Sequence, residues 1–347
     1  MTSAVDLRSD TVTRPSPEMR RVMMEAEVGD AVLGDDPTVN ELERYAAELL
    51  GKERALFFPS GIMANQTALL VLAAPGSEVL IEQGGHILNY EEGGAAAWAG
   101  VQLRAVPTPD GLLTARLLEP QLRPDSPYLP RQSVVCLENS HNHAGGRVLR
   151  LQELRRVSEL ARENGLGVHL DGARLPNCSA ATGVPLAEWA APADTVMVSL
   201  SKGLGAPVGS VLAGGAGEME RAWRVRRRLG GGMRQAGILA AAGLYALRHN
   251  SERITEDHRR ARELAAGLGA IPGLRAPVPD TNIVMVEVEE AIDAGALLAG
   301  LESREVLMIP FGPRRLRAVL HLDVDDAGVA HAVQAAGEAL AARRRTA

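Results

Sequence analysis

The sequence predicts an α/β fold in which a mostly parallel sheet forms a large domain, followed by a small α+β domain. Two observations lead to this prediction. Short, nearly all-apolar segments alternate with amphipathic ones through the first part of the chain, which is typical of a parallel sheet with helices on both faces. From about residue 246, charged helical segments and isolated strands replace that alternation. We therefore expect a large domain over residues 1–245 and a small one over residues 246–347.

The first clear helix is expected to begin at Thr38, because Thr38 and Glu41 have the spacing of a capping box, and to end at Gly51. The apolar run ALFF at 55–58 and a turn then lead into a second helix. The next strands are recognised by their apolar composition, and we place them at residues 79–82, 101–106, 133–138, 167–171, 195–200 and 210–213. The clearest helix between them spans residues 151–164.

The last part of the chain predicts three helices and two strands, with one helix between the two strands. A charged, arginine-rich helix is expected at 251–268, and strands at 282–288 and 316–322. The final helix is expected to start at Asp325 or Asp326, because aspartate is a good N-cap.

The composition is that of an ordinary globular protein. Of 347 residues, 46% are hydrophobic and 23% charged, and the net charge of −6 argues against a nucleic-acid partner, which requires a basic surface. We interpret the local basic run Arg221–Arg228 as the solvated face of a helix.

Cysteines and apolar segments indicate the compartment. Cys136 and Cys178 are too few for a disulfide framework, and the longest apolar stretch, 236–247, is too short to span a bilayer. The N-terminal residues do not resemble a signal peptide, so we expect a cytoplasmic protein with no membrane partner. His141 and His143 lack further ligands at a suitable spacing, so we expect no metal site.

Lysine use in this chain is unusual. Only Lys52 and Lys202 are lysines among 37 Lys and Arg residues. Arginine can replace lysine in ion pairs, but its guanidinium is a poor nucleophile, whereas a desolvated lysine amine can lose its proton and attack a carbonyl group. Lys202 lies in a loop of small residues at a strand end, so we interpret it as a candidate for a Schiff base. We interpret Lys52, which follows a helix end, as a surface lysine.

Other residues occur where a pyridoxal phosphate site would need them. Asp171 ends a strand, and an ionised carboxylate there would keep a pyridine nitrogen protonated. Ser60 and Gly61 stand between a strand and a helix, where backbone amides bind phosphate. His86 follows two glycines, and its ring could stack on a planar cofactor. Taken alone, Asp171 is better explained as a turn or helix-cap residue and His86 as a structural loop residue, and Ser60 and Gly61 could form a plain turn between strand and helix.

In their order along the chain, these motifs resemble those of the threonine aldolases, which are pyridoxal-phosphate-dependent enzymes of fold type I. The similar segments extend over nearly the whole chain and are DLRSDTVTRPSPEM (6–19), VGDAVLGDDPTVNELE (28–43), PSGIMANQ (59–66), LENSHNHAGGRV (137–148), HLDGARL (169–175), SLSKGLGAPVGS (199–210) and GGGMRQAGILAAAGLYAL (230–247).

The resemblance implies how the cofactor would be held. Lys202 would bind pyridoxal phosphate covalently through a Schiff base, and Asp171 would pair with its pyridine nitrogen. Ser60 and Gly61 would bind the phosphate. His86 would stack on the ring and take part in proton transfer.

The resemblance also implies a substrate site. Ser9, Arg174 and Arg317 would hold the carboxylate of the amino acid, with Arg174 close to the cofactor as well, and His141 would lie near the substrate hydroxyl. A guanidinium suits this task because it binds a carboxylate through two parallel hydrogen bonds. Arg234 would reach the phosphate of a neighbouring subunit, so the active site would lie at a dimer interface of a homo-oligomer, as a tetramer of two such dimers.

The implied reaction is the reversible cleavage of L-threonine or L-allo-threonine to glycine and acetaldehyde. The base for the β-hydroxyl proton could be His86, His141 or a water molecule that both hold. A lyase acting by β-elimination, a racemase or an aldolase for bulkier β-hydroxy amino acids would use the same Lys202 and Asp171, and so would stay open as alternatives. A non-enzymatic protein on this fold should have lost these residues.

The sequence departs from the family pattern at three places. Leu33 and the segment HILNYE (86–91) differ on the substrate side, which leaves the choice between the threo and allo substrates open. Ile62 stands where many relatives have threonine, so one hydrogen bond to the phosphate is expected to be missing.

Overall fold

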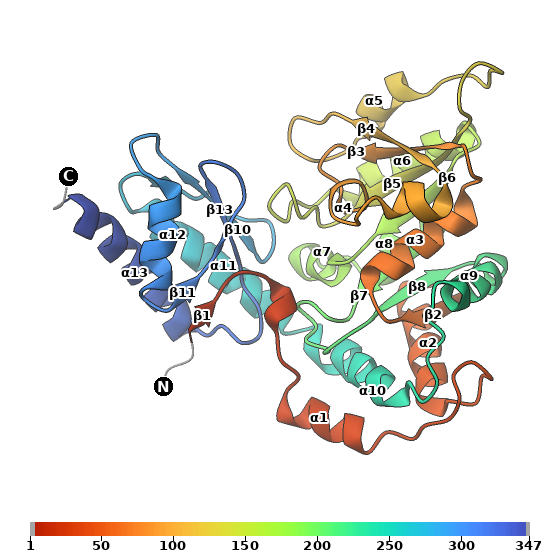
Figure 1. Ribbon diagram of the computed structural model, residues 1–347, viewed down its shortest axis with the longest axis horizontal. Helices are drawn as coiled ribbons and strands as arrows, with labels where there is room; N and C mark the ends of the chain where they lie inside the picture. The colour runs from red at the N-terminus through yellow and green to blue at the C-terminus, as the bar shows by residue number, and fades with distance from the viewer. Residues whose placement is uncertain (1–3, 345–347) are drawn as a thin grey trace.

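The structure of the protein is a computed structural model that describes residues 4–344. It has a large lobe and a small lobe, on the right and left of Figure 1. A seven-stranded sheet in the order β2-β8-β7-β6-β5-β3-β4 forms the centre of the large lobe. Its strands are β2 (Arg54–Phe58), β3 (Glu78–Glu82), β4 (Gln102–Val106), β5 (Gln132–Glu138), β6 (Gly167–Asp171), β7 (Thr195–Ser199) and β8 (Ser210–Gly214).

The mostly parallel sheet predicted from the sequence is confirmed. β4, β3, β5, β6 and β7 are parallel, and β8 runs antiparallel to both β2 and β7. In this sheet the ends of the predicted strands differ from the observed ends by at most one residue, whereas the strand predicted at 316–322 in the small lobe ends three residues earlier, at Val319. Every residue of β3, β7 and β8 is buried, which explains why these segments lack the alternation of a half-exposed strand.

Helices cover this sheet on both faces (Figure 1). The helices of the large lobe are α1 (Pro17–Met24), α2 (Pro37–Leu50), α3 (Gly61–Leu72), α4 (His86–Asn89), α5 (Ala115–Leu118), α6 (Leu151–Glu163), α7 (Leu175–Thr182), α8 (Leu186–Ala190), α9 (Ala216–Arg228) and α10 (Gly237–Tyr245). Short 3-10 or π-helical turns are η1 (Asp10–Val12), η2 (Ala95–Ala99), η3 (Glu119–Gln121) and η4 (Ala246–Asn250).

The predicted start of α2 is wrong. Asp36, and not Thr38, is its N-cap, and the Asp36 side chain accepts a hydrogen bond from the amide of Val39. Pro37 takes the first helical position, where its missing N–H group costs nothing. The Thr38 hydroxyl instead donates to the carbonyl of Glu27. The predicted helix end at Gly51 is correct, since Gly51 has a left-handed φ of 60°.

The basic run on α9 is only partly a solvated face. Arg221 and Arg224 are exposed, as expected. Arg226 is buried, and its guanidinium donates to the carboxylate of Glu43 and to the carbonyl of Phe57. The periodicity of the run could not distinguish this buried arginine from its neighbours, because its partners lie far away in the chain.

The small lobe has its own sheet and its own apolar core. The sheet has the order β12-β13-β10-β9. The elements of this lobe are α11 (Ile254–Gly269), β9 (Leu274–Arg275), β10 (Ile283–Val288), α12 (Ala294–Glu302), β11 (Val306–Leu307), β12 (Ile309–Pro310), β13 (Arg315–Val319) and α13 (Asp326–Arg344). The Asp325 carboxylate caps α13 through the amide of Gly328, which agrees with one of the two expected starts.

The N-terminal residues join this small lobe. β1 (Val5–Asp6) pairs in parallel with β11, and Leu7 belongs to the apolar core formed by α11, α12 and α13. From there the chain crosses to α1 on the large lobe (Figure 1). We still propose a domain boundary after residue 245. Residues 5–7 pack against the small lobe, which follows this boundary in the sequence.

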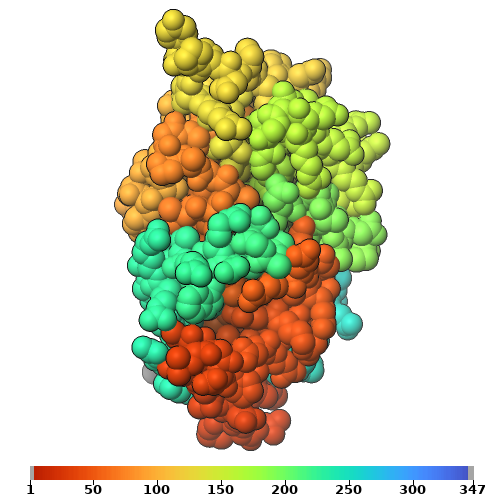
Figure 2. All heavy atoms as spheres, turned by 90° about the vertical axis from the view of Figure 1, so that its right-hand side faces the viewer, coloured from red at the N-terminus to blue at the C-terminus, as the bar shows by residue number. Residues whose placement is uncertain are grey.

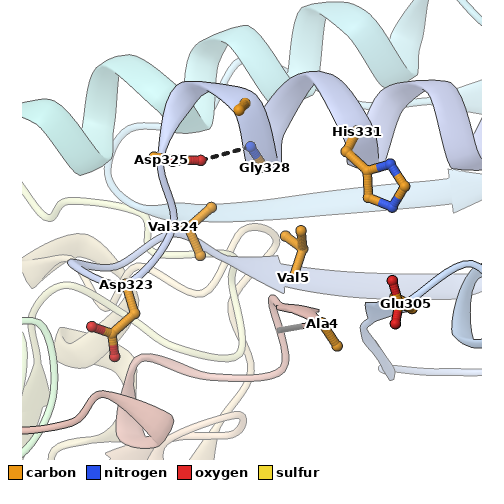
Figure 3. Close-up of a pocket in the computed structure, with 9 residues that line it drawn as sticks. Ala4, Val5, Glu305, Asp323, Val324, Asp325, Gly328 and His331 are labelled. Atoms are coloured by element: carbon orange, nitrogen blue, oxygen red, sulfur yellow. Dashed lines mark hydrogen bonds between the residues drawn. The ribbon is translucent and has the colours of Figure 1, made fainter. Parts of the chain in front are cut away.

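One cavity of about 430 Å³ lies where β1 meets the start of α13 (Figure 3). Glu305, Asp323, Asp325 and His331 contribute its polar lining. Its lining includes none of the predicted site residues, so it does not mark the predicted site. Within residues 4–344, no helix is both long enough and apolar enough to cross a membrane.

Candidate active site

Charged side chains gather at the carboxyl end of the parallel strands. Glu82 ends β3, Glu138 ends β5 and Asp171 ends β6, and Lys202 follows β7. In open α/β sheets, this edge is where ligands bind. The sheet therefore brings together Lys202 and Asp171, as the sequence predicts, and adds two carboxylates that the sequence analysis did not single out.

The Lys202 amine is desolvated and unpaired. Among residues 4–344 it has no hydrogen-bond partner, although the backbone carbonyl of Lys202 accepts from the hydroxyl of Thr13. Burial lowers the pKa of the Lys202 amine, and the positive charge of Arg174 lowers it further. An amine in this environment is readily deprotonated and can act as a nucleophile.

Asp171 is held in place by its neighbours. Its carboxylate accepts hydrogen bonds from the amide of Ala173, at 3.1 Å, and from the side chain of Asn65, at 2.9 Å. The following residue must be glycine, because a Cβ at Gly172 would lie 2.6 Å from the carbonyl oxygen of Met197. The turn after β6 can therefore pass close to β7, which keeps Asp171 at the sheet edge.

His86 opens α4 and is fixed at its backbone and at its ring. Its backbone amide donates to Glu138 over 2.7 Å, and its ring Nδ1 lies 2.9 Å from Oε1 of Glu91. Burial by itself would lower the pKa of His86, but the hydrogen bond to Glu91 and the charge of Asp171 raise it overall. The ring is partly exposed, with 28% of the side-chain surface accessible.

The His141 ring is held at Nδ1 and lies against a carboxylate at Nε2. Nδ1 accepts a hydrogen bond from the amide of Ala144, and Nε2 lies 2.9 Å from Oε2 of Glu82 without the geometry of a hydrogen bond. Burial would lower the pKa of His141, but the charges of Glu138 and Glu82 raise it overall. His141 is 2% exposed, so its ring has little freedom to turn toward another partner.

A second group of charges lies between the lobes. The Arg174 guanidinium makes two hydrogen bonds to Asp10, at 2.8 and 2.7 Å. Arg317, on β13, donates to the side chain of Asn142 at 2.8 Å, and its buried Nε has no partner among the described residues. Burial and the charge of Arg174 lower the pKa of Arg317 to about 10. Of the two guanidinium groups, only Arg174 is bonded to a carboxylate among the described residues, so Arg317 can receive a further anion.

Ser9 lies beside this group of charges. It precedes Asp10 and caps η1, accepting a hydrogen bond from the amide of Thr11. The serine is therefore brought close to Arg174 through Asp10, as the sequence predicts for a carboxylate-binding residue.

Ser60 and Gly61 stand at the start of α3. The Ser60 hydroxyl caps the amide of Met63, and Gly61 is the first helical residue. The first amides of a helix have no partner within it, so this end can receive an anion. Arg234 lies elsewhere on the surface, with 60% of its side chain exposed and an ion pair to Asp30.

A cavity of about 760 Å³ borders this site between the lobes. Glu82, His141 and Thr108 line it from the large lobe, and Arg275 and Arg315 from the small lobe. Of the predicted site residues, His141 alone lines this cavity.

The donor set suits pyridoxal phosphate. An unpaired, desolvated amine at Lys202 lies near the carboxylate of Asp171, at the edge of a sheet where α3 also presents its amino end. These are the groups that an aldehyde, a pyridine nitrogen and a phosphate require.

Comparison with known proteins agrees with this geometry. The profile of the beta-eliminating lyase family matches residues 6–291. Low-specificity L-threonine aldolase 1 of Arabidopsis thaliana is 43% identical over 334 residues, which are 94% of this chain and 93% of the relative. The chain belongs to this lyase family, among the threonine aldolases.

Other members of the family are equally similar. The low specificity L-threonine aldolase of Escherichia coli K12 is 45% identical over 92% of this chain and 94% of its own length. Among solved structures, a threonine aldolase of Leishmania major has a TM-score of 0.83 at 22% identity, over 96% of this chain and 98% of that one. At that identity, the solved structure demonstrates the shared fold alone.

Several residues of the candidate site were missed by sequence reasoning. They are the polar partners of the predicted residues, namely Asp10, Asn65, Glu82, Glu91, Glu138 and Asn142. For Glu82 and Glu138 a signal was available, because each is a charged residue that ends an apolar strand of a parallel sheet. The others lie on helices or loops, where a polar residue is ordinary.

Proposed function

We propose that this chain is a pyridoxal-phosphate-dependent aldolase that cleaves L-threonine and L-allo-threonine reversibly to glycine and acetaldehyde. The observation that carries the proposal is the desolvated, unpaired amine of Lys202 close to Asp171 and to the buried guanidinium groups. Membership of the threonine aldolase family selects this reaction among those that such a site could perform.

The residues divide into those that hold the cofactor and those that hold the substrate. Lys202 would bind the aldehyde of pyridoxal phosphate, Asp171 would keep the ring nitrogen protonated, and Ser60 with the amino end of α3 would bind the phosphate. When bound, the protonated ring supplies an acceptor for the electrons of the cleaved Cα–Cβ bond. Arg317, with Nη1 of Arg174, which donates to Asn142 at 3.4 Å, would bind the substrate carboxylate.

The substrate's β-hydroxyl must lose a proton as the bond breaks. His141 supports this step poorly, because its ring is buried, its Nδ1 is bonded to the amide of Ala144, and its Nε2 faces the Glu82 carboxylate. His86 has one nitrogen beside Glu91 and the other unoccupied among the described residues. We therefore assign the proton transfer to Nε2 of His86, directly or through a water molecule.

We also propose a homo-oligomer, a tetramer of two dimers with active sites at the dimer interface. Several large apolar side chains are exposed on α1, near α2 and on α10, including Met24 at 79% and Leu33 at 72%. The red N-terminal helices and the teal segment after β8 adjoin on one face of the large lobe (Figure 2). Arg234 forms an ion pair with Asp30, in the segment between α1 and α2, and would reach the neighbouring phosphate. The cytoplasmic location expected from the sequence stays a prediction.

The first test uses the purified protein with pyridoxal phosphate. We expect a visible absorption band from the bound cofactor, and release of acetaldehyde from L-threonine or L-allo-threonine. Lys202→Ala should abolish both, whereas Lys52→Ala should retain both, because the Lys52 amine donates to the carbonyl of Ala193 and has no role in the site. A band without acetaldehyde would contradict the aldolase and favour β-elimination, racemisation or a bulkier substrate.

A further inference from the structure

We propose that Glu91 is a positioning residue, which holds the His86 ring with its Nδ1–H group toward the Glu91 carboxylate and its Nε2 lone pair toward the substrate. This inference rests on the proposed function, because it assigns a second group to the proton transfer. Glu91 lies just after α4.

Glu91 is a fully buried carboxylate. It is 1% exposed. Its ion-pair partner is the His86 ring, which becomes a cation when it is protonated. Oε1 accepts from Asn65 at 2.8 Å and lies 2.9 Å from Nδ1 of His86, and Oε2 accepts from Gln66 at 2.6 Å. Burying a carboxylate is costly unless its oxygens are paired, so this set of donors indicates a defined task for the charge.

The contact decides the tautomer of His86. An ionised carboxylate can only accept hydrogen bonds, so Nδ1 must bear the proton in the contact with Glu91. The neutral imidazole then has its lone pair on Nε2. This is the state that a general base needs, with the free nitrogen on the side away from Glu91.

The orientation of Asn65 supports the same assignment. Its Oδ1 lies 3.1 Å from Nε2 of His169, whose pKa is lowered to about 4 by burial and whose ring is therefore neutral. Its Nδ2 group then points to Glu91, at 2.8 Å, and to Asp171, at 2.9 Å. One amide thus donates to both carboxyl groups and holds Glu91 and Asp171 side by side.

Two carboxylates joined in this way require nearby positive charge. One acceptor or donor atom from each of His86, Glu91 and Asp171 lies within 4.8 Å of the other two. When His86 takes the proton at Nε2, the imidazolium lies against Glu91, which stabilises it. Asp171 is directed toward the cofactor nitrogen in the proposed function, so Glu91 serves the histidine.

The groups facing His86 determine the sign of the pH effect. Glu91 and Asp171 raise its pKa, whereas burial and the charge of Lys202 lower it. Glu138 accepts from its backbone amide, and the Tyr90 ring lies 5.5 Å from the imidazole centroid. Removing the charge of Glu91 should therefore lower the pKa of His86, so that the base becomes neutral at a lower pH.

The test compares Glu91→Gln with Glu92→Gln, the same change at the adjacent, exposed position. For Glu91→Gln we expect the acid limb of the kcat/KM profile to move to lower pH, and kcat to fall about ten- to a hundredfold because the ring is no longer held. The affinity for pyridoxal phosphate and its absorption band should stay unchanged. Glu92→Gln should match the wild type in all three readouts.

A double substitution separates positioning from a general structural role. In a His86→Asn background, Glu91→Gln should cause no further loss of kcat, because it acts through the ring that has been removed. An additive loss together with an unmoved acid limb would overturn the proposal.

A measurement on the wild-type holoenzyme keeps the inference testable if Glu91→Gln does not fold. NMR of ring-labelled histidine, with His86 assigned by His86→Asn, should show the tautomer protonated at Nδ1. The Nε2-protonated tautomer would contradict the inference. This readout needs no turnover, so it still applies if the enzyme releases no acetaldehyde and the proposed function fails.

Discussion

At the scale of single residues, the site is defined by charges that lack partners. Arg317 is buried, its Nε has no partner among the described residues, and its pKa is lowered to about 10 by burial and by Arg174. Burying a cation without a counter-anion is unfavourable, and a bound carboxylate would relieve this. The two lysines differ in the same respect, because the Lys52 amine has a carbonyl partner and the Lys202 amine has none.

Arg317→Lys therefore should weaken substrate binding. A lysine amine cannot form the paired hydrogen bonds of a guanidinium, so we expect KM for L-threonine to rise by about ten- to a hundredfold. The affinity for pyridoxal phosphate should remain the same. Steady-state kinetics and cofactor titration measure the two effects. Arg314→Lys, which changes an exposed neighbour, should leave KM unchanged, and a larger loss of cofactor affinity than of substrate affinity in Arg317→Lys would contradict the assignment.

At the scale of elements, one buried aspartate joins three segments. The Asp36 carboxylate accepts from the amides of Val39 on α2, Gly29 in the preceding loop and Gly237 at the start of α10. A Cβ at Gly237 would lie 2.6 Å from the Asp36 carboxylate, so glycine is required for this approach. The N-cap of α2 is thus also the contact that holds α10 against it.

Asp36→Ala should lower the free energy of unfolding by about 2–4 kcal/mol, because it removes a cap and leaves buried amides without acceptors. Thr38→Ala should lower it by about 1 kcal/mol or less, since only one exposed hydrogen bond is lost. Urea unfolding measures both values. Equal losses would indicate that the capping box inferred from the sequence is the real helix start.

At the scale of the whole molecule, Asp10 lies where the lobes meet. It follows the N-terminal strand, pairs with Arg174 of the large lobe and accepts a weaker contact, at 3.4 Å, from Asn282 of the small lobe. Burial would raise the pKa of Asp10, but Arg174 lowers it overall to about 2, against an ordinary value of 3.8.

The stability of the protein should depend on this ion pair in acid. Because the pKa of Asp10 is lower in the folded protein, the pair stabilises the fold fully above about pH 5 and loses its effect as the pH falls toward 2. The shift corresponds to about 2 kcal/mol. Urea unfolding should show that, between pH 5 and pH 2, the free energy of unfolding falls by about 2 kcal/mol more in the wild type than in Asp10→Asn. The exposed Asp125→Asn should follow the wild type, and parallel losses in all three proteins would contradict the prediction.

Local patterns along the chain were sufficient to predict the parallel sheet, the positions of its strands and the edge at which Asp171 and Lys202 meet. These follow from local apolar periodicity and from the rule that parallel strands end at one edge, and both can be read along the chain. The family resemblance supplied the candidate roles of the site residues. Only the tertiary structure decided that Asp36 caps α2, that Arg226 is buried, and that Glu91 and Asp10 partner His86 and Arg174. The physical reason is that a buried charge is defined by partners from remote segments, and their approach depends on packing that a local pattern does not encode.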